Sequence, residues 1–352
     1  MTLLMSFILL SGCEEEQKSN QQPSYPDVDS YDFSAAAPWY TCDGLVIPEE
    51  ATVIAAFSQS DQYFGAENLR EISAEVDFPT EGDWKQVGLR FKLECPEEGQ
   101  CDHWDRSGSV QLVQGADSDS PSRVELARHI TAYRLGMCQY IDITPMAGLL
   151  QGTQTITSFI DTWVGPGHSD GDGWRTSVEF VFIPGAPAQA DEVINIWEFT
   201  SITVGEIEAG TTVQDQLEEM SFFIPEEATR VEAHLTTTGH SFGNTYNCAE
   251  FCKMRNDLSV NGELFTTYPW RNDCAENPVS PQSGTWEHNR NGWCPGAIAV
   301  GKKIDITEAV EVGAENNLTL DLLLNSGSEY DNYSPVDLLP YTLLSLKLYI
   351  YK

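Results

Sequence analysis

The chain has 352 residues, 41% of them hydrophobic, and this length exceeds what one core usually sustains, so we expect two domains. Its 54 acidic and 19 basic residues give a formal net charge of −35. Such a field repels nucleic acid phosphates and anionic lipid headgroups, which excludes polyanion binding. We interpret the acidity as a solvated surface that keeps the protein soluble.

The N-terminus is typical of a targeting segment. Residues 2–10 form a short apolar run that ends in Leu10-Ser11-Gly12-Cys13, which resembles a bacterial lipoprotein cleavage site whose cysteine becomes lipid-modified. We therefore expect residues 1–13 to comprise a signal peptide and the lipidated Cys13. Residues 14–44, rich in Gln, Ser, Pro and acids, have the composition of a flexible tether. These features predict an exported, lipid-anchored protein, periplasmic or on the cell surface of a bacterium.

Beyond the tether, the sequence predicts strands. Residues 87–93, 178–182 and 344–351 alternate apolar side chains with polar or small ones, and this period of two indicates strands with one buried face. Long helical periodicity is absent, while Gly and Pro recur at short intervals. The expected fold is all-β, built of antiparallel sandwiches or jelly rolls. The segment 184–187, Pro-Gly-Ala-Pro, predicts a boundary between domains at residues 45–185 and 186–352.

Eight cysteines remain once Cys13 is set aside, an even number that indicates disulfides in an exported chain, although 105 pairings are possible. Short spacing favours Cys95–Cys101 and Cys248–Cys252, and Cys274–Cys294 would bracket a loop rich in Pro, Gly and Asn. Cys42 and Cys138 could pair or could be free. A zinc site is disfavoured because no histidine stands in ligand register with these cysteines.

The first candidate site follows Cys101. A disulfide would brace a turn leading into Trp104, whose flat face suits stacking on a sugar ring, and into Asp105, a carboxylate able to act as general acid or base. Taken alone, Asp105 would be interpreted as a turn carboxylate that accepts backbone N–H groups. The run 101–106, Cys-Asp-His-Trp-Asp-Arg, resembles the Cys-Asp-x-Trp-Asp-Arg run of the peptide-N-glycosidase F family, whose second aspartate is the principal catalytic residue.

Other segments carry the same resemblance. The run 248–252, Cys-Ala-Glu-Phe-Cys, is similar to the family segment that holds a catalytic glutamate, which implies that role for Glu250. The disulfide would fix the direction of this side chain. Residues 274–296 resemble the family's third disulfide segment, which implies that Arg290 lies near the substrate. For Trp293 we weigh substrate contact and core packing equally.

Two segments depart from the family pattern. Residues 160–163, Ile-Asp-Thr-Trp, resemble a strand that ends in Thr-Glu-Thr-Trp, so the third acid is Asp161, one methylene shorter than glutamate. We expect Asp161 to share a strand face with Trp163 in an aromatic-lined cleft. Before Glu250, the family's Gly-Trp-Gly-His is replaced by Thr-Gly-His, which loses a tryptophan and retains His240.

The resemblance covers roughly residues 78–300 and implies two adjacent eight-stranded antiparallel jelly-roll domains, a cleft between them, and no metal or other cofactor. It implies hydrolysis of the amide bond between asparagine and the innermost N-acetylglucosamine of N-linked glycans. The expected partners are N-glycosylated peptides or glycoproteins, with a monomeric enzyme reaching the membrane only through its lipid anchor. The implied catalytic residues are Asp105, Glu250 and Asp161, and the implied substrate-binding residues are Trp104, Arg106, Trp163, His240, Arg290 and Trp293.

Two other classes of function were weighed. A surface lipoprotein that binds N-glycans without turnover would have the same fold, and the substitution at Asp161 leaves this alternative open. A copper-dependent hydroxylase with related architecture would need clustered histidines. The six histidines, at positions 103, 129, 168, 234, 240 and 288, show no paired ligand spacing, which disfavours copper.

Overall fold

The computed structural model describes residues 39–116, 118–203, 213–241, 249–327 and 340–352. The expected signal peptide with Cys13 and most of the expected tether lie outside these residues, as does Cys248. Within the described part the chain is almost wholly β, and every pair of named strands is antiparallel. The expectation of an antiparallel all-β protein is confirmed.

The first sandwich encloses a core built mainly from residues 57–190. One sheet has the order β1 (Thr52–Gln62), β8 (Trp174–Pro184), β3 (Trp84–Glu94), β6 (Met137–Asp142). The facing sheet has the order β16 (Ala297–Ala299), β5 (Ser122–Ile130), β4 (Ser107–Gln114), β7 (Gly152–Ile160), β2 (Glu71–Phe78). A 3-10 helix, η1 (Thr144–Leu149), follows β6 and packs Met146 into the same core.

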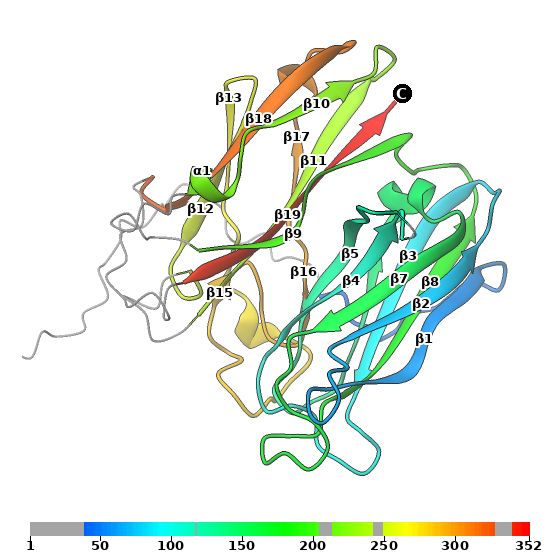
Figure 1. The fold of residues 1–352 in the computed structure, drawn as a ribbon, viewed down its shortest axis with the longest axis vertical. Coiled ribbons are helices and arrows are strands. Elements are labelled where there is room, and N and C mark those ends of the chain that lie inside the picture. The colour runs from blue at the N-terminus through cyan, green and yellow to red at the C-terminus, as the bar shows by residue number, and fades with distance from the viewer. Residues whose placement is uncertain (1–38, 117, 204–212, 242–248, 328–339) are drawn as a thin grey trace, which may run out of the picture.

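The second sandwich encloses a core of residues between Ile196 and Ile350. One sheet has the order β10 (Met220–Ile224), β18 (Ala314–Leu324), β12 (Met254–Val260), β13 (Glu263–Thr267). The other has the order β17 (Lys302–Asp305), β11 (Arg230–His240), β19 (Tyr341–Tyr351), β9 (Glu192–Thr203). Figure 1 shows the two sandwiches next to each other, with β1 to β8 in one and β9 to β13 with β17 to β19 in the other.

Short elements complete the described chain. The pair β14 (Trp270–Arg271) and β15 (Arg290–Asn291) flanks the 3-10 helix η3 (Cys274–Glu276), and η4 (Thr307–Ala309) follows β17. Among the described residues there is one α-helix, α1 (Val213–Gln216), which is four residues long. None of the helices in the described ranges has the length and apolar character needed to cross a membrane.

Alternation of apolar and polar residues explains the first core. The residues expected on one face of β3 and β8 are at most 1% exposed: Val87, Leu89, Phe91, Leu93, Val178, Phe180 and Phe182. Between them, Arg90 and Lys92 point to the outer face, where they form ion pairs with Glu179 and Glu94. Burial of each large apolar side chain contributes about 1.5–3 kcal/mol, so this pattern determines which face of each sheet turns inward.

The last strand is buried on both faces. Leu344, Leu346, Leu348 and Ile350 join the second core, as their alternation predicts. The intervening Ser345 and Lys347 are also buried, at 1% and 2% exposure, because this face of β19 packs on β5 of the first sandwich. Strand β16 connects the halves further, since it pairs with β5 although it belongs to the later part of the chain.

Three disulfides agree with the expected pairings. Cys95–Cys101 and Cys274–Cys294 close loops beside the candidate site, and Cys42–Cys138 settles the open choice in favour of pairing. The expected Cys248–Cys252 pairing includes a residue outside the described part. The count of eight strands per domain, the jelly-roll connectivity and the boundary at residues 185 and 186 stay predictions.

Candidate active site

The loop that carries Asp105 is organised by the carboxylate of Asp102, which is fully buried. Its oxygens accept hydrogen bonds from the backbone N–H of Trp104 at 3.0 Å, from Nε of Arg106 at 2.7 Å and from the hydroxyl of Thr162 at 2.7 Å. A buried carboxylate held by this many donors is rigid. Asp102 therefore fixes the backbone on both sides of Asp105, between the Cys95–Cys101 disulfide and β4.

Asp105 points toward the second half of the chain. Its Oδ2 accepts a hydrogen bond of 2.7 Å from the hydroxyl of Tyr133 and lies 3.6 Å from Nη2 of Arg290. Burial raises the pKa of Asp105 above its usual range, while the positive charge of Arg290 and the Tyr133 hydrogen bond oppose the shift. The carboxyl group is thus partly desolvated but has partners for its charged form.

Glu250 reaches the same guanidinium from the opposite side. Its Oε1 accepts a hydrogen bond of 3.0 Å from Nε of Arg290, and its backbone carbonyl accepts one from the N–H of Asn291. Burial, and then the negative charge of Asp105, raises the pKa of Glu250 to about 7. Two acids whose protonation is coupled through one arginine can act as a proton donor and a proton acceptor near neutral pH.

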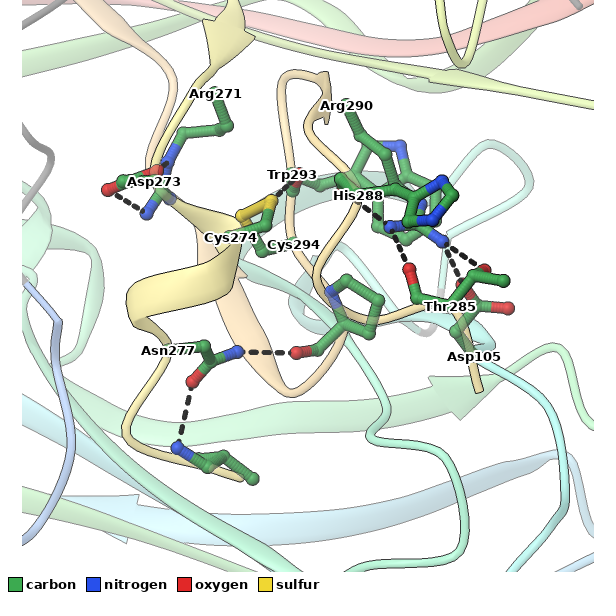
Figure 2. Close-up of a disulfide and its surroundings, with 12 residues drawn as sticks. Asp105, Arg271, Asp273, Cys274, Asn277, Thr285, His288, Arg290, Trp293 and Cys294 are labelled. Atoms are coloured by element: carbon green, nitrogen blue, oxygen red, sulfur yellow. Dashed lines mark hydrogen bonds and ion pairs between the residues drawn. A yellow bond between two sulfur atoms is a disulfide. The ribbon is translucent and has the colours of Figure 1, made fainter. Parts of the chain in front are cut away.

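Arg290 is the centre of this arrangement. It is fully buried, and its Nη1 donates to the carbonyl oxygens of Thr285 at 3.0 Å and His288 at 2.7 Å. Its guanidinium also lies 5.1 Å from the ring centre of Phe251 and 4.8 Å from that of Trp293. Figure 2 shows this group with Thr285 and Asp105 on one side and the Cys274–Cys294 disulfide nearby. Bonded at this many points, the guanidinium cannot turn away from the acids.

A stack of three rings lies behind the guanidinium. Trp293 is 2% exposed and donates its indole N–H to the carbonyl of Gly239 at 2.7 Å, and its ring stacks on His240 with centres 5.2 Å apart. His240 stacks in turn on Tyr341, at 5.4 Å, and burial lowers the pKa of His240 to about 3, so the imidazole is neutral. For Trp293 this burial agrees with core packing, one of the two roles weighed for it, and Trp293 supports Arg290. For His240 it differs from the expected substrate contact, because the imidazole is enclosed between two rings.

Asp161 occupies a different part of the site. It lies just beyond β7, which ends at Ile160, and its Oδ1 is 3.4 Å from Nη1 of Arg70. Its N–H donates to the carbonyl of Ser107, the first residue of β4, so Asp161 directly continues the pairing of β7 with β4. Burial raises the pKa of Asp161, while Arg70 and then Arg106 lower it.

Aromatic side chains surround Asp161. Trp163 and Trp104 are 52% and 47% exposed, which leaves flat apolar faces open to solvent. Arg70 lies over two rings, 4.4 Å from the centre of Trp163 and 4.9 Å from that of Phe64. Exposed tryptophans next to charged hydrogen-bonding groups are suited to carbohydrate, whose rings have apolar faces and polar edges.

The site also contains residues that the sequence motifs did not indicate, namely Arg70, Tyr133, Thr285 and Tyr341. Tyr341 lies close enough to both Asp161 and Glu250 to feel their negative charges. Burial, followed by these two charges, raises the pKa of its phenol to about 12. No sequence signal could have found Arg70, Tyr133 and Tyr341, since each is far in the chain from the acid that it faces. Thr285 lies within the run 274–296 but bonds Arg290 and Tyr133, contacts that the run does not reveal. In the described ranges, no group of three His, Cys, Asp or Glu side chains is placed to hold a metal ion.

The raised pKa of Glu250 predicts a loss of stability at higher pH. A carboxyl group whose folded pKa lies above its unfolded value holds more protons in the folded state, so its contribution is complete below the ordinary pKa of 4.5 and is lost as the pH rises through about 7. We expect the free energy of unfolding to fall between about pH 5 and pH 8, with Glu250 contributing on the order of 3 kcal/mol. Urea titrations across this range measure the slope.

The variant Glu250→Gln isolates this contribution, because it keeps the size of the side chain and cannot ionise. Its free energy of unfolding should fall less steeply with pH than that of the wild-type protein. The exposed Glu263→Gln serves as the matched control and should follow the wild type. Equal slopes for Glu250→Gln and the wild type would contradict the assignment of the raised pKa to Glu250.

Comparison with known proteins shows similarity in sequence and in fold. A family model described as the C-terminal part of peptide-N-glycosidase F matches residues 208–335. A curated relative, the peptide-N(4)-(N-acetyl-beta-D-glucosaminyl)asparagine amidase F of Elizabethkingia miricola, is 26% identical over 274 residues, or 74% of each chain. The solved structure of PNGase F, a glycosylasparaginase from Flavobacterium meningosepticum, matches with a TM-score of 0.71 and 21% identity, over 86% of this chain and 96% of that one. The fold is therefore shared.

Proposed function

Because the chain belongs to the peptide-N-glycosidase F family, we propose that it hydrolyses the amide bond between asparagine and the innermost N-acetylglucosamine of N-linked glycans. The products would be a peptide containing aspartate and a glycosylamine. The observation that carries this proposal is the pair of acids, Asp105 and Glu250, bound to opposite sides of the buried Arg290. One of them titrates near neutral pH.

The chemistry demands both a base and an acid. The amide has a poor leaving group, so water must be activated while the departing nitrogen gains a proton. Asp105 would accept a proton from water as the water oxygen bonds to the carbonyl carbon of the asparagine side chain. The proton would then pass to the sugar-bearing nitrogen as the carbon–nitrogen bond breaks. Asp105 thus ends the cycle in its starting form, as a primary acid/base must.

Glu250 and Arg290 would act together in this step. Arg290 is held in place by the carbonyl groups of Thr285 and His288, so its charge needs no reorganisation when negative charge develops on the reacting carbonyl. Glu250, with a pKa of about 7, can donate a hydrogen bond when protonated and accept one when ionised. We assign to Glu250 the orientation of the substrate amide.

The glycan would lie along the exposed aromatic side chains. Trp104 and Trp163 offer stacking faces, while Asp161, held by Arg70, would accept a hydrogen bond from a sugar hydroxyl or hold a water molecule. Arg106 lies on the same loop as Asp105 and adds a positive charge near Asp161. The shorter side chain of Asp161, relative to glutamate, would change glycan preference without removing the two acids that perform hydrolysis.

Mass spectrometry of an N-glycopeptide after incubation with the protein tests the proposal. Amide hydrolysis converts asparagine to aspartate and releases the whole glycan. An endoglycosidase would leave one N-acetylglucosamine on the peptide. A non-catalytic glycan-binding protein would leave the peptide intact while retaining it on the protein, and either of these last two results would overturn the proposal.

We also propose that the protein is exported and anchored by lipid on Cys13. The three disulfides support export, because such bonds persist in oxidising compartments. The apolar run before Cys13 supports the anchor. Metabolic labelling with a fatty acid and loss of the label in Cys13→Ala provide the test, in which an unlabelled wild-type protein counts against the anchor.

A further inference from the structure

A cavity of about 370 Å³ lies in the seam between the two sandwiches, apart from the candidate active site. It is lined by β5 and the segment around η1 on one side, and by β11, β19 and the segment from β16 to β17 on the other. His234, in the middle of β11, lines it, whereas His240, the last residue of β11, stacks on Trp293 in the candidate active site. Six strand residues span roughly 20 Å, so the cavity and the acids are separate sites.

Lys347 forms the charged part of this cavity. Its side chain is 2% exposed, and its ammonium donates a hydrogen bond of 2.8 Å to the backbone carbonyl of Glu125. An ammonium group has three N–H donors, and this is the one acceptor that the described residues supply. Burial lowers the pKa of Lys347 to about 8, so the group is still charged at neutral pH.

The neighbouring carboxylate is already engaged. Both oxygens of Glu125 accept hydrogen bonds of 2.8 Å from Arg128, and one of them also accepts from the hydroxyl of Ser345. Arg128 directs its remaining donors to Thr238 and to the carbonyl of Leu343. Glu125 and Arg128 therefore form a neutral, closed pair, which leaves the charge of Lys347 without a carboxylate of its own.

Two further charged residues, at the edge of the cavity, do not provide a partner for Lys347. Lys303 and Asp142 are both exposed, with Lys303 directed to Glu232 at 3.8 Å and Asp142 bonded to Thr144. The two nitrogens of His234 are bonded to Tyr349 and to the carbonyl of Val300, and burial lowers the pKa of His234 to about 3. The charges of Lys303 and Asp142 are screened by solvent, so Lys347 is the buried positive charge of the lining that has no carboxylate partner.

The remaining walls are mostly apolar. Apolar residues that line the cavity include Leu126, Ile141, Ile143, Met146, Ile298 and Val300. A buried charge is costly unless it is paired, and apolar walls favour an apolar body. We infer that this cavity is a binding site for a small organic carboxylate, whose head pairs with Lys347 while its hydrocarbon part contacts these walls.

Calorimetry with butanoate, pentanoate and hexanoate tests this inference at about pH 6, below the pKa of Lys347. Affinity should rise about fourfold with each methylene group, and the alcohols of equal length should bind at least tenfold more weakly. Alcohols that bind as tightly as the acids would overturn the inference, as would an absence of binding. The comparison needs no variant, so misfolding cannot obscure it.

The variant Lys347→Met then tests whether the bound carboxylate pairs with Lys347. It keeps an unbranched side chain and leaves the neutral pair of Glu125 and Arg128 intact, so the fold should persist, which circular dichroism can verify. Hexanoate affinity should fall at least tenfold, whereas Lys85→Met, an exposed change of equal charge, should bind as the wild type does. Unchanged affinity in Lys347→Met would place the carboxylate elsewhere. Glycopeptide hydrolysis does not enter these readouts, so this inference and the proposed function can fail independently.

Discussion

Replacing Asp105 by asparagine is expected to reduce the release of glycan from a denatured glycopeptide by about 10²- to 10⁴-fold, the usual contribution of a general acid or base. Asparagine has nearly the shape of aspartate and can still accept the hydrogen bond from Tyr133. It cannot accept a proton from water. The rate under single-turnover conditions with excess enzyme measures this loss, because product release does not limit it.

The same variant should stay folded. Burial raises the pKa of Asp105, which shows that its charge is not a source of stability by itself, although Arg290 and Tyr133 offset part of the cost. The exposed Asp119→Asn is the matched control and should retain the wild-type rate. Full activity in Asp105→Asn, together with a wild-type unfolding curve, would remove Asp105 from the catalytic role and with it the proposed mechanism.

Replacing Arg290 by methionine is expected to cost about 3–5 kcal/mol of stability, since it removes one partner from a buried set of charges. Glu250 and Asp105 would lose the guanidinium between them, and the carbonyl oxygens of Thr285 and His288 would lose their donor. The pKa of Glu250 and that of Asp105 should both rise further, because Arg290 lowers each of them. The midpoint of urea unfolding at about pH 7.5 measures the effect.

A second substitution separates charge from packing in this variant. If uncompensated charge is the cause, Arg290→Met combined with Glu250→Gln should recover part of the lost stability, because one unpaired carboxylate is gone. If lost packing against Trp293 and Phe251 is the cause, the second change should recover nothing. Arg230→Met, at a side chain that is 49% exposed, should change the midpoint little. A small shift in Arg290→Met would contradict the central position given to Arg290.

The buried face of a strand could be predicted from the sequence where the strand packs only against the facing sheet of its own sandwich. Val87 and Phe180 are buried as their alternation requires. Lys347 follows the same alternation and was expected on an open face, yet it is buried, because β5 of the first sandwich covers that side of β19. The period of two in a sequence reports the contacts of one sheet with its own core. It carries no signal for a second sandwich that packs on the outer face, so the seam and its cavity could not be predicted.

In the candidate site, too, some features could be predicted from the sequence and others only from the fold. Asp105 and Glu250 could be found because the short runs that contain them, 101–106 and 248–252, resemble runs of the peptide-N-glycosidase F family. Their shared dependence on Arg290 could not, since the ion pairs join residues that are 185 and 40 positions apart in the sequence. Tyr133 has no motif around it, and its bond to Asp105 exists only because β5 and β4 are adjacent. Sequence runs indicate which chemical groups are present, whereas the fold determines which of them meet.

The position of β16 has a consequence for synthesis of the protein. Residues 297–299 complete the five-stranded sheet of the first sandwich by pairing with the edge of β5. The N-terminal half is synthesised first, so the edge of β5 at residues 128–130 lacks its partner strand until most of the chain has emerged, although β4 pairs with its other side. An open strand edge is a point of aggregation. The first sandwich therefore has an exposed edge during synthesis, which its own later strand covers once residues 297–299 are available.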